Sequence, residues 1–154
     1  MADKGKRKFV LYAVVIIAGI ALASIYFMLG PPKLLAKSNS PDFCGGCHVM
    51  EDEYEAWSHT GAHRRKKCVD CHLPNENAAV HYAWKAIDGL KDVAFFYSGR
   101  VPEQIKLTQH GEKVLQTNCV RCHENTVMLI DTERQCWKCH RRISHKRSGA
   151  MQTL

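Results

Sequence analysis

Hydrophobic positions are concentrated in one uninterrupted run near the N-terminus. Residues 9–29 (FVLYAVVIIAGIALASIYFML) include 21 positions and no charged side chain. At about 1.5 Å per residue, a helix of this length crosses the roughly 30 Å hydrocarbon layer of a bilayer. Gly30 and two prolines follow directly and predict the end of that helix. The pattern therefore predicts one transmembrane helix over residues 9–29.

The segment before this run predicts its orientation. Residues 1–8 (MADKGKRK) carry four basic residues and one acid, and basic flanks stay in the cytoplasm. The triplet Ala21-Leu22-Ala23 resembles a signal-peptide cleavage site, but cleavage there would leave the apolar stub 25–29 on a soluble protein. We therefore expect an uncleaved anchor in a bacterial inner membrane. The expected organisation is a cytoplasmic tail (1–8), an anchor (9–29), a periplasmic domain (30–145) and a C-terminal tail (146–154).

A second patterned segment covers residues 77–97 (NAAVHYAWKAIDGLKDVAFFY). Its composition predicts a helix, with Pro74 and Asn75 as a plausible start and Gly99 as a plausible end. The segment is also rich in aromatic residues, which are typical of a membrane interface. These residues are Tyr82, Trp84, Phe95, Phe96 and Tyr97.

Charged residues on this predicted helix have a helical spacing. Lys85, Asp88 and Asp92 occupy positions i, i+3 and i+7, which lie on one helix face. One interpretation is a solvated face with a modest ion pair. The other is a Lys/Asp pair near the bilayer surface that hydrogen-bonds a quinol headgroup and accepts its protons.

All eight cysteines occur in C-x-x-C pairs, and a histidine follows each pair directly. The four motifs, numbered 1 to 4, are Cys44/Cys47/His48, Cys68/Cys71/His72, Cys119/Cys122/His123 and Cys136/Cys139/His140. Cysteines three residues apart on one helical turn can reach both vinyl groups of a haem, and the adjacent histidine can reach its iron. Paired C-x-x-C motifs also occur in zinc ribbons, but four histidines in the same relative place favour four covalent haems c.

The length of the domain predicts its fold class. Residues 30–154 provide 125 residues for four haems. So short a chain buries little apolar surface alone, so we expect a mainly α, haem-dominated fold with short helices, long loops and an unstable apoprotein. The gaps between successive motifs are 19, 46 and 12 residues. They predict two di-haem units, motifs 1–2 and motifs 3–4, joined by one insertion.

Four haem irons with two protein ligands each need eight ligands, and the motif histidines are candidates for four. The other histidines are His59, His63, His81, His110 and His145. His145 lies five residues past motif 4, so we expect it to serve the neighbouring haem of the second unit. Either His59 or His63 is expected to be a ligand, and His63 is favoured. The two histidines of the insertion are expected to be surface residues.

Motif 1 contains a second candidate ligand. Met50 follows His48 by two residues, and a thioether is a weaker donor than imidazole that raises the haem potential. The alternative is that Met50 only packs on the haem edge as a flexible apolar side chain. From the residues alone, bis-histidine ligation is not assured for every haem.

The formal net charge is +7, which by itself would be compatible with nucleic-acid or anionic-lipid binding. Four haems would add eight propionates and offset this charge, and no nucleic-acid recognition module is visible. We therefore expect membrane lipid, and no nucleic acid, among the partners.

Taken together, the chain resembles the NapC/NirT family of membrane-anchored multihaem quinol dehydrogenases, and within it the small subunits of cytochrome c nitrite reductases. The specific marks are CGGCHVM (44–50) and KAIDGLKD (85–92), with one anchor and four motifs around them. The resemblance implies that Met50, and not His48, binds the first haem iron. It also implies that Lys85 and Asp92 line a menaquinol site beside that haem.

The resemblance implies further iron ligands. His63 and His145 match the family's distal ligands, and His72, His123 and His140 its motif ligands. It also suggests that haem 2 can take a lysine from the catalytic partner.

The implied activity is that of a quinol dehydrogenase subunit, which passes electrons to a periplasmic reductase. The resemblance favours the pentahaem, ammonia-forming nitrite reductase as partner, and reductases of nitrate or trimethylamine N-oxide are alternatives. A tethered electron carrier without a quinol site is a second possibility. A haem-based sensor is a third, for which the eight-residue tail leaves no signalling domain.

Overall fold

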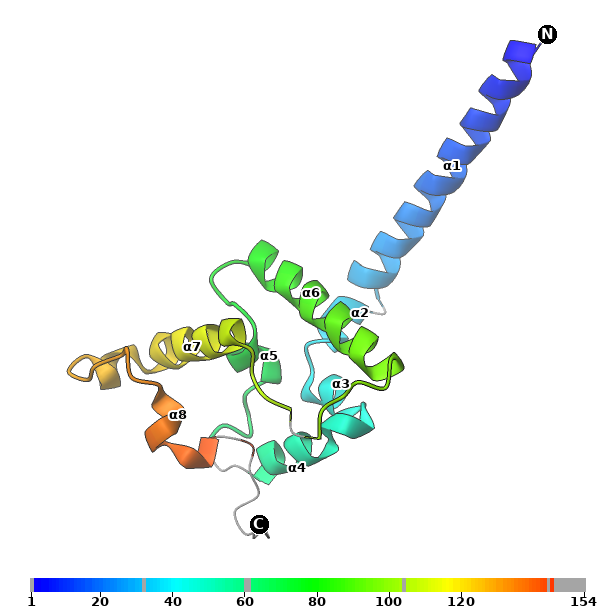
Figure 1. Cartoon of the computed structure of the whole chain (residues 1–154). Coiled ribbons are helices and arrows are strands. Elements are labelled where there is room, and N and C mark those ends of the chain that lie inside the picture. The colour runs from blue at the N-terminus through cyan, green and yellow to red at the C-terminus, as the bar shows by residue number, and fades with distance from the viewer. Residues whose placement is uncertain (1, 32, 60–61, 104, 144, 146–154) are drawn as a thin grey trace. The chain divides into compact units, whose positions relative to one another are not determined.

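The computed structural model describes residues 2–31, 33–59, 62–103, 105–143 and 145 (Figure 1). These residues form helices, 3-10 turns and loops, and no strand occurs among them, which confirms the mainly α fold class. The chain divides into two compact units, Met1–Ser40 and Pro41–Leu154. The predicted C-terminal tail, 146–154, lies outside the described residues.

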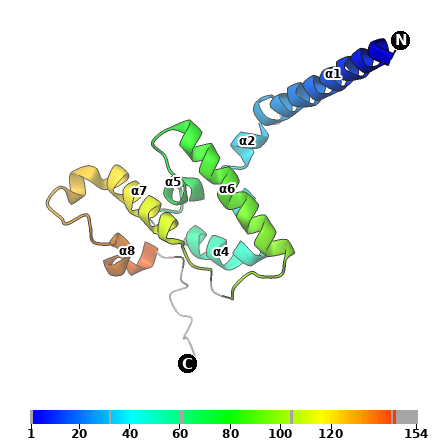
Figure 2. The same cartoon turned by 45° about the horizontal axis from the view of Figure 1, so that its top comes forward.

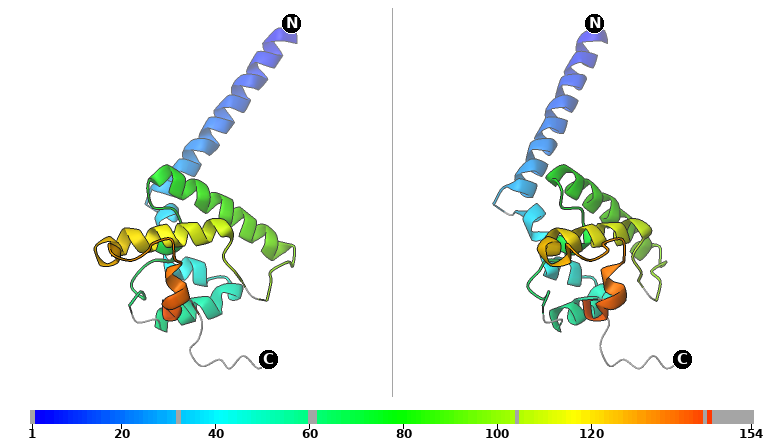
Figure 3. Two further views of the ribbon diagram at one scale, coloured as in Figure 1. Left: turned by 60° about the vertical axis from the view of Figure 1, so that its left-hand side comes forward. Right: turned by 90° about the vertical axis from the view of Figure 1, so that its left-hand side faces the viewer.

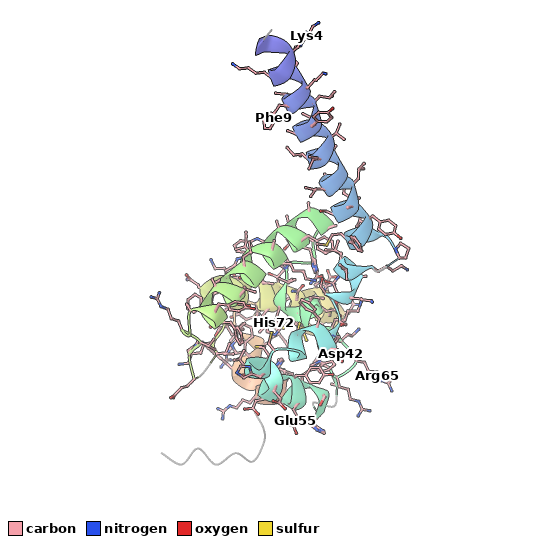
Figure 4. All side chains as sticks on the ribbon, turned by 90° about the vertical axis from the view of Figure 1, so that its right-hand side faces the viewer. Lys4, Phe9, Asp42, Glu55, Arg65 and His72 are labelled. Carbon is pink, nitrogen blue, oxygen red and sulfur yellow. The ribbon has the colours of Figure 1, made fainter. Side chains whose placement is uncertain are left out.

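The first unit contains α1 (Ala2–Leu29) and α2 (Leu34–Lys37). Between Lys4 and Leu29, α1 is long and apolar enough to cross a membrane, and none of this span is buried in the protein. The side chains extend from all sides of α1, as Lys4 and Phe9 illustrate (Figure 4). The helix begins before the predicted run because the basic residues of the tail continue it. It ends at Leu29, as predicted.

The second unit has two long helices and several short ones. Its elements are α3 (Pro41–Gly45), η1 (His48–Met50), α4 (Glu51–His59), α5 (Cys68–His72), α6 (Ala78–Tyr97), α7 (Gln109–Val127), α8 (Cys136–Cys139) and η2 (Arg141–Ile143). The helices α6 and α7 lie on one side of this unit, and α4 and α8 lie on the other (Figures 1 and 3). The short α5 packs against α7, which Figure 2 shows from a second direction.

The predicted insertion helix is confirmed as α6. Its N-cap is Asn77, whose side-chain oxygen accepts a hydrogen bond from the Val80 amide at 2.9 Å. Pro74 and Asn75, the expected start, lie outside the helix. At the other end Ser98 is the C-cap, and Gly99 has a φ of +66° that favours glycine. Local capping chemistry therefore sets both ends of α6.

Few side chains of the second unit are buried. The buried apolar residues are Ala56, Val69, Leu73 and Val114. Apart from the first, they lie in α5, directly after it, or in α7. Asn118 of α7 is only 4% exposed and lies at the same place. The protein-only core is thus small and centred on the α5–α7 contact, in keeping with a chain this short.

Candidate functional site

Three of the four C-x-x-C pairs lie on regular helical turns. Motif 2 forms all of α5, motif 3 lies within α7, and the cysteines of motif 4 begin and end α8. In motif 3 the helix is kinked at His123, where φ is −112° and ψ is 17°. This arrangement agrees with the expectation that each cysteine pair occupies one turn.

Motif 1 has a different conformation. Helix α3 ends at Gly45, Cys47 is extended with φ −93° and ψ 125°, and η1 begins at His48. The histidine of this motif is therefore not carried by the helical turn that holds Cys44. A 3-10 helix has three residues per turn, so His48 and Met50 also point in different directions.

Packing explains why motif 1 contains a glycine at its second position. A Cβ on Gly45 would lie 2.5 Å from the Tyr54 ring. The Tyr54 hydroxyl donates a hydrogen bond to the Asp42 carboxylate at 2.7 Å, which joins α4 to α3. Figure 4 marks Asp42 on α3. Glycine thus permits close approach of the aromatic ring to the haem-attachment segment.

The four motifs lie next to one another in chain order. Hydrogen bonding between the side chains of Cys44 and Cys68 lowers the pKa of Cys44 to about 7 and raises the pKa of Cys68. Desolvation first, and then Cys136 of motif 4, raises the pKa of Cys119 to about 11. The structure thus brings together the members of each predicted di-haem unit. Cys71 also lies near Cys122. Motif 2 of the first di-haem unit is therefore close to motif 3 of the second, which the gap lengths did not predict.

Two motif histidines face a histidine from elsewhere in the chain. The ring centroids of His72 and His145 are 5.8 Å apart, and those of His123 and His63 are 6.1 Å apart. Metal–imidazole bonds are about 2 Å long, so rings on opposite sides of one metal have centroids roughly 6 Å apart. Both pairs therefore have a spacing compatible with axial ligation of one iron.

The environment of these imidazoles suits metal binding. Desolvation, with His145 as a second cause, lowers the pKa of His72 to about 4. Desolvation also lowers the pKa of His145, although Glu53 opposes it. Both rings are thereby kept neutral, the form that binds a metal. Figure 4 shows His72 inside the second unit, whereas Glu55 and Arg65 extend outward.

The position of His145 differs from the expectation that it lies in the second di-haem unit. Its ring lies beside that of His72 of motif 2. The same contact places a histidine where the family resemblance suggested a partner lysine, beside motif 2. His140 is exposed, and among the described residues no histidine ring contacts it.

The remaining histidines have different surroundings. His59 is exposed at the end of α4, so the structure brings His63, and not His59, to a motif histidine. His110 is half-buried and stacks on Trp84 with ring centroids 3.6 Å apart. His81 is half-buried too, with Nδ1 3.0 Å from the Pro74 carbonyl oxygen. Both insertion histidines are thus partly exposed and pack against other parts of the protein, and neither ring contacts a motif histidine among the described residues.

Helix α6 lies along motif 1. Lys85 is close enough to Cys44 for each to change the other's pKa, although desolvation is the larger effect and lowers the pKa of Lys85. Farther along α6, the Phe96 ring lies 5.6 Å from the His48 ring. Lys85 of the predicted charged face and Phe96 of the aromatic residues thus lie adjacent to the first attachment motif.

The acidic residues of α6, Asp88 and Asp92, interact with Lys91 of the same helix. Lys91 forms an ion pair with Asp88 at 2.8 Å, and its Nζ lies 3.9 Å from Asp92. Partial desolvation raises the pKa of Asp92, and Lys91 opposes this change. The Asp92 side chain is 74% exposed, so its carboxylate is accessible from outside the protein.

The donor set fits haem c. Each cysteine pair can form two thioether bonds, and all eight cysteines are free of disulfides. Two irons would find facing imidazoles. The buried Nδ1 of His63 has no hydrogen-bond partner in the described part of the chain, which leaves this nitrogen available to a metal. The residues that would hold the haems are therefore present in usable arrangements.

Comparisons with known proteins agree with this chemistry. Residues 6–152 match the model of the NapC/NirT cytochrome c family, N-terminal region. The chain is 31% identical to the cytochrome c-type protein NrfH of Wolinella succinogenes, over 91% of this chain and 88% of that protein. It is 28% identical to the cytochrome c nitrite reductase subunit NrfH of Nitratidesulfovibrio vulgaris, over 87% and 81% of the two chains.

A solved structure is also similar. A chain in the crystal structure of the cytochrome c nitrite reductase NrfHA complex bound to the inhibitor HQNO superposes with a TM-score of 0.66. The match has 26% sequence identity and covers 90% of this chain and 92% of that one.

The sequence reasoning missed three residues around motifs 2 and 3, namely Asn75, Asn118 and Arg121, which form a hydrogen-bond network. No pattern in a single sequence separates such residues from ordinary polar ones. The family model covers nearly the whole chain, and membership of a cytochrome c family implies covalently bound haem c. The helix α1 is the single-pass membrane anchor. The chain belongs to the NapC/NirT cytochrome c family.

Proposed function

We propose that this protein is a membrane-anchored tetrahaem subunit that oxidises menaquinol and passes the electrons to a periplasmic cytochrome c nitrite reductase. The observation that carries the proposal is the position of α6 beside motif 1, with Lys85 near Cys44 and Phe96 against His48. A quinol site must lie beside the haem that receives its electrons. The resemblance to two NrfH subunits supports the choice of partner.

The geometry of motifs 2 and 3, together with the family resemblance, supports a set of proposed ligands for the four haem irons. His72 with His145, and His123 with His63, form the axial pairs of motifs 2 and 3. For motif 1 we assign Met50, as the resemblance to the NapC/NirT family implies, and η1 carries it two residues after His48. The proposed iron ligands are Met50 for motif 1, His72 and His145 for motif 2, His123 and His63 for motif 3, and His140 for motif 4.

The haems supply one-electron redox chemistry, while the protein manages the two protons that each quinol releases. Lys85 lies nearer to motif 1 and can donate a hydrogen bond to a quinol oxygen. The raised pKa of Asp92 makes its carboxylate a better proton acceptor, because the protonated form is held more tightly. Its exposure provides a route for the proton to water.

The topology of the proposed complex follows from the basic N-terminal tail. The tail remains in the cytoplasm, so the haem-binding unit and the proton exit lie on the periplasmic side. In the proposed complex, quinol binds beside motif 1, which α6 contacts, and the reductase binds beside motif 4, whose histidine is exposed. Pentahaem nitrite reductase is the proposed acceptor.

Quinol-dependent reduction in vesicles tests the proposal. The full-length protein is reconstituted in lipid vesicles, a menaquinol analogue is added, and haem absorbance is followed. Lys85→Ala and Asp92→Asn should each abolish reduction by quinol while dithionite still reduces all haems. Lys106→Gln is the control, because it removes one exposed positive charge outside α6 and should retain quinol oxidation.

Two results would contradict parts of the proposal separately. Normal quinol oxidation by both site variants would favour a tethered carrier without a quinol site. Co-purification with a nitrate or trimethylamine N-oxide reductase, and no electron delivery to a pentahaem nitrite reductase, would reject only the proposed partner.

A further inference from the structure

The starting observation is that motif 2 lies on a helix too short to be stable by itself. Helix α5 has five residues, and isolated helices below about 12 residues are marginal in water. The last four carbonyl groups of a helix also have no partner within it. Something outside α5 must therefore satisfy these carbonyls and hold the motif in place.

Asn118 of α7 provides part of that support. Its Nδ2 donates hydrogen bonds to the carbonyl oxygens of Cys71 and Leu73, at 3.0 and 2.9 Å. It is the one polar residue among those described that is buried, with 4% of its surface exposed. It also directly precedes Cys119. A single buried side chain thus connects a haem-attachment cysteine of motif 2 with one of motif 3.

Two neighbours complete the network. Asn75 Nδ2 lies 3.2 Å from Asn118 Oδ1 and within hydrogen-bond distance of three carbonyl oxygens, two in α5 and one directly after it, so its two N–H groups are shared among four acceptors. Those carbonyl oxygens belong to Val69 at 3.2 Å, Asp70 at 3.2 Å and Leu73 at 2.7 Å. From within motif 3, Arg121 Nε donates to Asn118 Oδ1 at 3.1 Å and Nη2 donates to the Asp70 carbonyl at 3.2 Å. Beside the Leu73 amide, which donates to the Val69 carbonyl at 3.2 Å, the described donors at the C-terminal end of α5 are thus the side chains of Asn75, Asn118 and Arg121.

We infer that Asn118 is a positioning residue that sets motif 2 relative to motif 3, and with them the two haems that these motifs attach. This inference rests on the haem and ligand assignments of the proposed function. The reason is geometric, because thioether bonds at Cys71 and Cys119 transmit any shift between α5 and α7 to the porphyrins. A satisfied buried network allows few alternative arrangements, whereas an unsatisfied one is costly.

The test uses purified full-length protein in detergent and does not depend on quinol. Asn118→Leu keeps the side-chain size and removes all of its hydrogen bonds. The intact mass shows whether four haems are attached, and electron paramagnetic resonance of the oxidised protein shows the low-spin haems. We expect four haems, shifted signals for the two bis-histidine haems, and loss of the magnetic interaction between them.

Asn125→Leu is the matched control, because Asn125 is an exposed asparagine on the same helix, and it should reproduce the wild-type spectrum. If Asn118→Leu does not mature, Arg121→Gln replaces it, since Arg121 is exposed and its loss removes only the outer donors. The same two signals should then shift. A variant with four haems and an unchanged spectrum overturns the inference, and failure of the quinol experiment leaves this result unaffected.

Discussion

The two inner motifs, 2 and 3, and the two outer motifs, 1 and 4, have different surroundings. Each inner motif histidine faces a second histidine at about 6 Å between ring centroids. The buried residues Leu73 and Asn118 lie between the inner motifs. In the outer motifs neither histidine contacts another histidine ring among the described residues, whereas exposure alone does not separate the two pairs, because His123 of motif 3 is exposed like His48 and His140. The inner motifs thus have facing histidines and a buried network between them, and the outer motifs lack the facing histidines among the described residues.

This difference matches the roles that the two pairs have in the proposed electron path. Haems in the middle exchange electrons only with other haems, so complete ligation and a fixed separation are useful there. A haem at either end must meet a molecule from outside, either a quinol beside α6 or a protein partner. An open and less regular environment at motif 1, including the break at Cys47, is compatible with that task.

The largest expected effect is on the accumulation of the protein. Replacing both cysteines of motif 2 by serine removes the haem that α5 attaches, and the α5–α7 contact holds most of the buried residues. We expect at least a several-fold loss of protein in the membrane fraction, since losses of 1–2 kcal/mol already change abundance that much. The same change in motif 4 should leave a protein with three haems. Immunoblots measure the amount of each variant and haem staining its haem content. Equal losses of protein in the two variants would contradict the difference between inner and outer motifs.

The next effect concerns the axial ligands of the inner pair. His145→Ala should convert one low-spin haem to a high-spin form, because the ring that faces His72 is lost. Added imidazole should restore the low-spin signal in electron paramagnetic resonance. His59→Ala is the control, since His59 is exposed at the end of α4. A high-spin signal from His59→Ala and none from His145→Ala would exchange the two assignments.

The sequence predicted features that depend on local chemistry. The apolar run predicted α1, the capping and aromatic pattern predicted α6, and the motif spacing predicted the cysteine-bearing turns. Each of these needs only residues within a few turns of one another. The length and composition also predicted how small the protein-only core would be.

The sequence did not predict the long-range pairs. His63 meets His123 from sixty positions away, and His145 lies beside motif 2 instead of the second di-haem unit. Loops fold back through tertiary contacts that leave no periodic pattern. The same holds for Asn118, whose importance depends on the position of α5 and not on its neighbours in sequence.

A smaller effect is expected on stability at the core of the inner pair. Leu73→Ala removes a buried side chain directly after α5 and should lower the free energy of unfolding by about 2–5 kcal/mol. Leu90→Ala removes an exposed leucine from α6 and should change it by less than about 0.5 kcal/mol. Urea unfolding of the two full-length variants in detergent, followed by circular dichroism, gives both values. A similar cost for both would mean that the α5–α7 contact is not the core.

The smallest expected effect is within motif 1, where two adjacent glycines provide a matched pair. Gly45→Ala places a methyl group 2.5 Å from the Tyr54 ring, so the ring must move and its hydrogen bond to Asp42 is lost or distorted. Overpacking of this kind costs about 1–3 kcal/mol. At Gly46 the nearest atoms are 3.4 Å away, so Gly46→Ala should change stability by less than about 0.5 kcal/mol.

Both free energies come from the same urea unfolding measurement. Equal costs would mean that Tyr54 does not constrain motif 1. A Gly45-specific cost with unchanged spectra from motifs 2 and 3 would show that the outer motif is held by its own local packing, independently of the inner pair.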